Sequence, residues 1–262
     1  MRPAILPLLT ALVAPSSALD NGLALTPPMG FANWNGFGCH YNDTTFRQQA
    51  DYLNSSGLAA LGYRTMIIQE CITLAGHRAP DGTPQPDPKK FPYGIKGLCD
   101  YIHTKGLLCG IYTDVGPKTC AGWEGSFNHD EIDAKTYAEW GIDFVEEDSC
   151  HHAETAKDPH AKDGKPIPYS VLYGRMRDAL NKTGRPIVFY MCVQGQERVQ
   201  EWGPSTGNLW RTTGDICGPG HASWGGVIRN FYGDTKYPNS TMPGAWQDPD
   251  VSLILPLSPP DR

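Results

Sequence analysis

Short, continuously apolar runs alternate along this chain with longer segments of helical period. The runs occupy residues 63–71, 106–114, 141–148, 185–192 and 207–215. An apolar run without polar alternation is typical of a strand buried on both faces, as in a parallel sheet covered by helices. Parallel strands need crossover connections, which the helical segments supply. The pattern therefore predicts an α/β fold built around a parallel sheet, in one large domain.

Four segments between the runs carry helix signals. The first follows Asp43, a good N-cap residue, and the segments end at Gly57, Gly106, Gly141 and Gly184. A glycine after the last periodic residue is a common end of a helix. Segment 81–94 is rich in proline and is predicted to be a structured loop rather than a linker.

Polar residues stand where these strands end. They are Trp34, Glu70, Asp114, Asp148, Cys192 and Asp215. One charged residue after a strand would be the ordinary start of a solvated loop. Several at the same end of successive strands indicate a site, because a (β/α) barrel builds its active site at the carboxyl ends of its strands.

Two aspartates among them, Asp148 and Asp215, form the candidate catalytic pair. Glycoside hydrolysis needs two carboxyl groups that flank the glycosidic bond, and rigid strand ends hold such groups in place. Arg211 precedes Asp215 by four residues and is close enough to order the site. Spacing alone supports the pair only weakly, because the chain has 28 acidic residues.

Residues 1–18 have the pattern of a secretory signal peptide, with Arg2, a short apolar run and small residues before a cleavage point after Ala18. A disordered or buried N-terminus is the alternative. The run is too short to span a bilayer, and no other membrane segment is predicted. Residues 19–262 are then the secreted catalytic domain.

Other features agree with an oxidising, extracellular location. Eight cysteines occur without paired CxxC motifs, which favours disulfides over zinc. Sequons for N-glycosylation stand at Asn42, Asn54, Asn181 and Asn239. The net charge of −6 argues against nucleic acid as a partner, since phosphate binding requires a basic surface. No glycine-rich phosphate loop is present.

Several long motifs resemble glycoside hydrolase family 27, the α-galactosidases or melibiases. LALTPPMGFANWNGFGC at residues 23–39 resembles the opening of that family, and residues 86–126 are similar to it almost throughout. DAKTYAEWGIDFVEEDSC, WGPSTGNLWRTTGDI and PGAWQDPD continue the resemblance in order. It covers residues 23 to about 250.

The resemblance implies a retaining double displacement on a (β/α)₈ TIM barrel, with Asp148 as nucleophile and Asp215 as acid/base. Other sugar-site positions of the family fall on Trp34, Tyr112, Arg211 and Asp250. The partner is then an oligosaccharide or glycoside, and we expect no metal or other cofactor. The histidines His129, His151 and His152 lack the spacing of a helical ligand face and are interpreted as polar loop residues.

The resemblance also implies two disulfides, Cys39–Cys71 and Cys120–Cys150. Cys99, Cys109, Cys192 and Cys217 are left without an assigned partner. We expect Cys99 and Cys109 to be buried free thiols. Of the six tryptophans other than Trp34, Trp246 is expected nearest the pocket.

Three departures from the family bear on the substrate. The second strand ends in Gln69-Glu70 instead of two aspartates, Glu146 replaces a lysine, and Val193-Gln194 replaces a polar residue and tryptophan. Alternation along a strand puts Glu146 on the side of Asp148, where a carboxylate raises the pKa of its neighbour. Gln69, Glu70 and Glu146 are therefore candidate substrate residues that reshape the pocket, whereas Glu147 faces away and is structural or solvated.

These departures leave alternatives open. One is a hydrolase for a related sugar, such as a β-L-arabinopyranoside or an α-N-acetylgalactosaminide, because buried hydroxyl recognition discriminates strongly. Another is a carbohydrate-binding protein without catalysis.

After PGAWQDPD the chain reads VSLILPLSPPDR, where the family continues with a last strand, a helix and a β-sandwich domain. Seven strands are expected, the seventh at about residues 248–255. The barrel is then incomplete, and its first and last strands have exposed edges. We expect this polypeptide alone to be poorly soluble or inactive.

Overall fold

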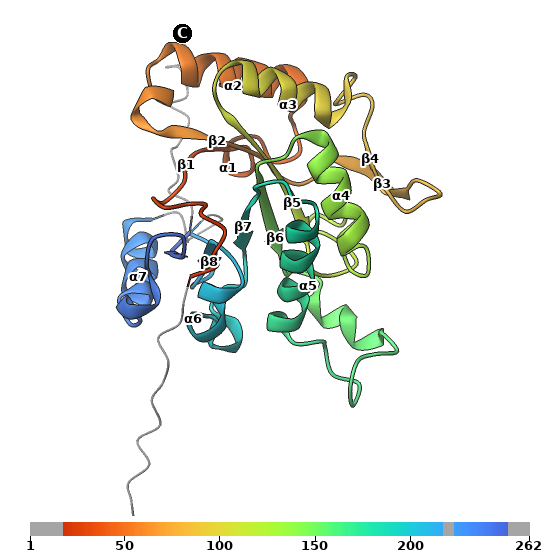
Figure 1. Ribbon diagram of the computed structural model, residues 1–262, viewed down its shortest axis with the longest axis vertical. Helices are drawn as coiled ribbons and strands as arrows, with labels where there is room; N and C mark the ends of the chain where they lie inside the picture. The colour runs from red at the N-terminus through yellow and green to blue at the C-terminus, as the bar shows by residue number, and fades with distance from the viewer. Residues whose placement is uncertain (1–17, 217–222, 251–262) are drawn as a thin grey trace, which may run out of the picture.

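Seven parallel strands form one curled sheet in the computed structural model, which describes residues 18–216 and 223–250. Figure 1 shows this half-barrel with helices on its outer face. The strands follow the order β1 (Met29–Ala32), β2 (Tyr63–Ile68), β5 (Leu108–Asp114), β6 (Phe144–Asp148), β7 (Val188–Met191), β8 (Leu209–Arg211) and β9 (Trp246–Asp248). The described residues thus confirm an incomplete (β/α)₈ barrel.

Helices connect the strands as crossovers. They are α1 (Trp34–Phe37), α2 (Asp43–Ser55), α3 (Gly94–Thr104), α4 (Asp130–Trp140), α5 (Tyr169–Lys182), α6 (Val199–Trp202) and α7 (Trp224–Asp234). All four helix ends predicted at glycines are confirmed, since Gly57, Gly106, Gly141 and Gly184 have positive φ. None of the described helices combines the length and the apolar character that a membrane span requires.

The N-cap of α2 is Asn42, not the predicted Asp43. The Asn42 side chain accepts a hydrogen bond from the Thr45 amide at 3.0 Å, and the Thr45 hydroxyl accepts one from the Asn42 amide. This capping box satisfies two amide donors reciprocally. Asp43 lies one position inside the helix and pairs with Arg47 instead.

The boundaries of several segments differ from those that the sequence pattern predicts. The run 207–215 contains only three strand residues, so Asp215 lies in the loop after β8. The last described strand is Trp246–Asp248, whereas a strand at 248–255 was expected, and residues 251–255 lie outside the described part. The predicted loop 81–94 contains β4 (Pro84–Pro86), which pairs antiparallel with β3 (Thr73–Arg78). Residues 1–17 of the predicted signal peptide also lie outside the described part.

The two faces of the sheet form different cores. Phe144, Tyr190 and Leu209 pack together inside the barrel. Their sequence neighbours on the same strands, Val145, Phe189 and Trp210, pack under the helices. Because side chains alternate along a strand, this register fixes which residues at the strand ends point inward.

The disulfides Cys39–Cys71 and Cys120–Cys150 are confirmed, with Cα–Cα distances of 5.6 and 5.1 Å. A third bond joins Cys99 of α3 to Cys109 of β5, so the prediction of free thiols there is wrong. Both residues are fully buried where the helix packs on the strand that follows it, 5.3 Å apart at Cα. Cys192 is buried and unpaired, and Cys217 lies outside the described part.

Candidate active site

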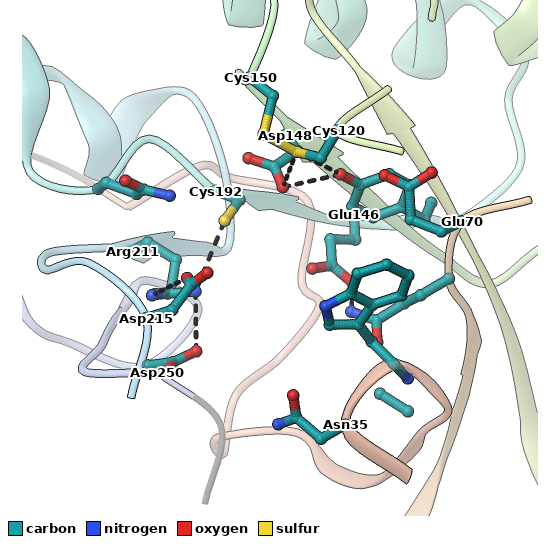
Figure 2. Close-up of a pocket in the computed structure, with 15 residues that line it drawn as sticks. Asn35, Glu70, Cys120, Glu146, Asp148, Cys150, Cys192, Arg211, Asp215 and Asp250 are labelled. Atoms are coloured by element: carbon teal, nitrogen blue, oxygen red, sulfur yellow. Dashed lines mark hydrogen bonds and ion pairs between the residues drawn. A yellow bond between two sulfur atoms is a disulfide. The ribbon is translucent and has the colours of Figure 1, made fainter. Parts of the chain in front are cut away.

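A cavity of about 200 Å³ opens at the carboxyl ends of the strands. Nine residues singled out from the sequence line it: Trp34, Gln69, Glu70, Tyr112, Glu146, Asp148, Arg211, Asp215 and Asp250. Figure 2 shows Asp148 and Glu146 on one side of it, with Arg211, Asp215 and Asp250 opposite. The cavity is smaller than the roughly 300–1,000 Å³ typical for drug-sized ligands, which suits a single sugar ring.

Asp148 ends β6 and is buried. Its Oδ2 accepts a hydrogen bond from the Tyr112 hydroxyl at 2.8 Å, and its Oδ1 accepts one from the Ser149 amide at 2.7 Å. Burial raises the pKa of Asp148, while these donors and the Arg211 charge oppose the rise. The Cys120–Cys150 disulfide packs beside it, with Cys120 Sγ 3.2 Å from Oδ2.

Asp215 approaches the cavity from the loop after β8, and its side chain is 50% exposed. Arg211, buried at the end of β8, binds Asp215 through Nη2 at 2.9 Å. Its Nη1 lies 2.8 Å from the Asp250 carboxylate. One guanidinium thus holds two carboxylates on the far side of the cavity from Asp148, a geometry that the planar fork of arginine suits.

Two of the departures, Gln69 and Glu146, contact each other. Gln69 Nε2 donates to Glu146 Oε2 at 2.7 Å, and the Trp34 amide donates to Gln69 Oε1 at 3.3 Å. Glu146 lines the cavity beside Asp148, as predicted. Burial and the Asp148 charge raise the pKa of Glu146 to about 8, while Gln69 and Arg211 lower it.

The carboxylate of Glu70 accepts two hydrogen bonds from the loop after β5. Its Oε2 accepts from the Thr119 hydroxyl at 2.6 Å and its Oε1 from the Ala121 amide at 2.9 Å. Glu70 itself has a positive φ of 56°, which turns the chain sharply after β2. Glu70 therefore lines the cavity while it fixes the loop that carries Cys120.

Asp114 does not line the cavity, although it ends a strand beside Asp148. Its two oxygens accept hydrogen bonds from the amides of Gly116 at 2.7 Å and Cys150 at 2.8 Å. Burial and the nearby Asp148 raise its pKa to about 8. Asp114 therefore positions the loops that follow β5 and β6.

The expectation for Trp246 is wrong. Trp246 packs on Phe144, Tyr190 and Leu209 inside the barrel, and its indole N–H donates to the Ala24 carbonyl at 2.7 Å. It begins β9, below the strand ends, so its ring does not reach the cavity.

The sequence analysis did not name Asn35 as a lining residue, whereas Cys192, singled out at a strand end, and Gln194, singled out as a departure from the family, both line the cavity. Gln194 follows β7 with a positive φ of 50°, while its neighbour Val193 is buried in the core. For Asn35, its place after the end of β1 was the available signal, because an asparagine does not by itself mark a chemical role.

Among the described residues, Asp114, Cys120, Asp148 and Cys150 come close enough together to suggest a metal site. The two sulfur atoms are joined in a disulfide, so this group offers no thiolate ligand. His151 and His152 are held within their loop, by Glu154 and by the Ile167 carbonyl.

Comparison with known proteins identifies the family of this chain. Residues 26–258 match the family described as alpha galactosidase A (Melibiase_2). A probable alpha-galactosidase of Dictyostelium discoideum is 41% identical over 254 residues, which cover 97% of this chain and 61% of that relative. The chain belongs to this melibiase family.

Solved structures of alpha-galactosidases share the fold. Alpha-galactosidase I from Mortierella vinacea matches with a TM-score of 0.78 and 34% identity, over 88% of this chain and 60% of that one. An alpha-galactosidase from Saccharomyces cerevisiae, solved with raffinose, matches with a TM-score of 0.77 and 30% identity, over 91% and 54%. This melibiase-family chain thus spans less than two thirds of the relatives named here.

Proposed function

We propose that this chain carries the active site of a retaining glycoside hydrolase that cleaves terminal α-galactosides. The observation that carries the proposal is the placement of Asp148 and Asp215 at one cavity in unlike surroundings. Asp148 is buried and held by two donors, whereas Asp215 is half exposed and paired with Arg211. A nucleophile must be ionised and a general acid must be protonated, so the two carboxyl groups need unlike environments.

In the first step, the Asp148 carboxylate attacks the anomeric carbon, and the bond to the leaving oxygen breaks. Asp215 gives its proton to that oxygen, so the alcohol departs and a glycosyl ester remains on Asp148. In the second step, the Asp215 carboxylate removes a proton from water, which attacks the same carbon and releases Asp148. The tyrosine hydroxyl of Tyr112 and the charge of Arg211 favour the ionised nucleophile.

Hydrolysis of p-nitrophenyl α-galactoside tests the two roles. We expect Asp148→Asn to lower kcat by about 10⁴–10⁶-fold, as loss of a nucleophile does. We expect Asp215→Asn to lower it by about 10²–10⁴-fold, the range for general acid/base groups. Asp163→Asn, at an exposed loop position, is the matched control. Proton NMR of the first-formed sugar should show the α-anomer; a β-anomer would contradict retention.

The identity of the sugar is tested with a substrate panel. The relatives named above are alpha-galactosidases, and one was solved with raffinose. Aryl β-L-arabinopyranoside, α-N-acetylgalactosaminide and α-glucoside should be poorer substrates than the α-galactoside. If one of these three is hydrolysed faster than the α-galactoside, the proposed mechanism still holds but the proposed substrate is wrong.

A carbohydrate-binding role without turnover is favoured by one observation, the buried Glu146 beside Asp148. Calorimetric titration with galactose decides between the two. Binding that Asp148→Asn leaves intact, in a chain that hydrolyses none of the panel, would support the binding role.

Secretion and N-glycosylation are part of the proposal. The side chains of Asn42, Asn54, Asn181 and Asn239 are all exposed, as acceptors of a bulky glycan must be. Expression in a eukaryotic secretory host, followed by glycosidase treatment and mass spectrometry, tests each site. Retention of residues 1–18 in the exported protein would contradict the predicted cleavage.

A further inference from the structure

The cavity holds more negative charge than its cation can balance. Among its described lining residues, five are carboxylic acids, Glu70, Glu146, Asp148, Asp215 and Asp250, and Arg211 is the one basic side chain. The two nitrogens of Arg211 that face the cavity are bound to Asp215 and Asp250. Glu146 and Asp148 therefore share one wall of the cavity without a cation in contact.

These two carboxyl groups are unequal competitors for one proton. They stand two residues apart on the inner side of β6, and both are buried. Neighbouring like charges in a site with little water do not both ionise readily, so the pair retains a proton. Asp148 receives two hydrogen bonds, from Tyr112 and Ser149, whereas Glu146 receives one, from Gln69. The proton therefore resides on Glu146.

Gln69 determines which oxygen of Glu146 carries that proton. The Trp34 amide donates to Gln69 Oε1, which turns the Nε2 amino group toward Glu146. Glu146 Oε2 accepts from this group and so serves as the carbonyl oxygen of the acid. The acidic hydrogen is then on Oε1, which has no hydrogen-bond partner among the described residues and belongs to a side chain that lines the cavity.

We propose that Glu146 is a specificity-determining residue that binds the sugar as a neutral carboxylic acid, donating a hydrogen bond from Oε1 to a substrate hydroxyl. The inference rests on the proposed function of the site. Glu146 thereby offers the sugar a donor on a wall that otherwise presents acceptors. It also leaves Asp148 as the single anion of the pair, which a nucleophile requires.

The groups around Glu146 agree with this state. Asp148 on its own strand and Asp248 on β9 disfavour its ionisation, and Arg211 on β8 favours it. Tyr190 and Cys192, from β7 and its end, are buried nearby, and burial raises the pKa of each above its ordinary value. Because the pKa of Glu146 is raised to about 8, its proton is present at neutral pH and is lost as the pH rises through that value.

The pH dependence of kcat/KM for aryl α-galactosides tests the proposal. The parent protein should lose activity as the pH rises through about 8. Glu146→Gln keeps a donor that cannot ionise, so its alkaline limb should move to higher pH. Glu146→Ala has no donor and should fall at least about tenfold below Glu146→Gln at about pH 6, the size of one hydrogen bond. Glu139→Gln, on the exposed face of α4, is the control and should keep the parent profile.

An alkaline limb that stays in place in Glu146→Gln would overturn the proposal, as would equal activities of the Gln and Ala variants. A second readout does not need turnover. In protein labelled with ¹³C at the glutamate carboxyl carbons, the resonance that disappears in Glu146→Gln should keep the shift of a protonated acid at about pH 6, with and without galactose. The shift of a carboxylate at that pH would refute the inference. Absence of hydrolysis across the whole panel would instead refute the proposed function.

Discussion

Gln69 donates a hydrogen bond to Glu146 over 2.7 Å and so joins the ends of β2 and β6 across the intervening strand β5. Both are candidate substrate residues in the sequence, and the structure shows them in direct contact. The bond stabilises the ionised form of Glu146, because an amide donor favours a carboxylate over the neutral acid.

Replacing Gln69 by methionine should therefore have a pH-dependent cost. We expect a loss of about 0.5–1.5 kcal/mol in unfolding free energy near pH 6, where the bond joins neutral groups, and about 1.5–3 kcal/mol near pH 9, where Glu146 is charged. The sign follows from the Gln69 hydrogen bond, which lowers the pKa of Glu146, so that its loss costs more stability once the pH has risen through about 8 and Glu146 is ionised. Urea midpoints at the two pH values measure the difference. In the Glu146→Gln background, the cost of Gln69→Met should no longer vary with pH.

Glu147 should destabilise the folded protein at neutral pH. It is fully buried, and neither carboxyl oxygen has a hydrogen-bond partner. Burial and the nearby Asp130, Asp114 and Asp133 raise its pKa well above the ordinary value. Stability is then fully present below the pKa of the unfolded state and is lost as the pH rises toward the folded value.

Substitution of Glu147 by leucine should stabilise the protein by about 1–3 kcal/mol at pH 7, because it removes an unsatisfied buried group. The gain should be smaller at about pH 5, and Glu147→Gln should give only part of it. Thermal unfolding at both pH values provides the measurement. A leucine variant less stable than the parent at both would mean that the carboxyl has a partner after all.

Arg211 should not tolerate lysine. Its two terminal nitrogens bind Asp215 and Asp250 at 2.9 and 2.8 Å, and the side chain is buried. Lysine offers one ammonium group in place of a planar fork, so one carboxylate loses its partner. We expect kcat/KM to fall by about 10²-fold or more, in line with misplacement of a catalytic group. Arg211→Met should in addition lose about 3–5 kcal/mol of stability, because it leaves buried charge uncompensated.

The Cys99–Cys109 bond should contribute measurable stability. The cross-link closes a short loop, since the two residues are 10 positions apart. For a loop of that size, the chain-entropy estimate is about 2–3 kcal/mol. Peptide mapping without reduction should recover the two segments joined, and the Cys99→Ala/Cys109→Ala variant should lower the urea midpoint. Recovery of both cysteines as free thiols from the parent protein would contradict the structure.

Patterns that depend on local sequence predicted the type of most elements correctly, although several of their boundaries differ. Continuous apolar runs predicted a parallel sheet, and glycines marked the helix ends. Five of the six residues singled out at strand ends line the cavity, because the carboxyl ends of parallel strands meet at one edge, and the resemblance to the family supplied Tyr112, Arg211 and Asp250.

Features that depend on packing between different elements could not be predicted from local sequence. Gln69 and Glu146 are 77 positions apart, and nothing local indicates their contact. Cys99 and Cys109 are close in sequence, but their bond depends on how α3 packs on β5. Trp246 is the first residue of β9, so its ring lies below the strand ends. The sequence pattern did not indicate this, because strand boundaries are its least reliable part.

The position of β6 in the sheet has a consequence for the timescales on which the two sides of the site open. β6 is the middle of the seven described strands and is hydrogen-bonded to β5 and β7, whereas β1 and β9 are the outermost. Local opening is easiest where backbone hydrogen bonds have neighbours on one side only. Amide hydrogens around Asp148 should therefore exchange with deuterium only through unfolding of the whole domain. Those of β1 and β9, next to Trp34 and Asp250, should exchange first, so that the side of the cavity that carries Asp148 stays fixed while the sides next to the outermost described strands open locally.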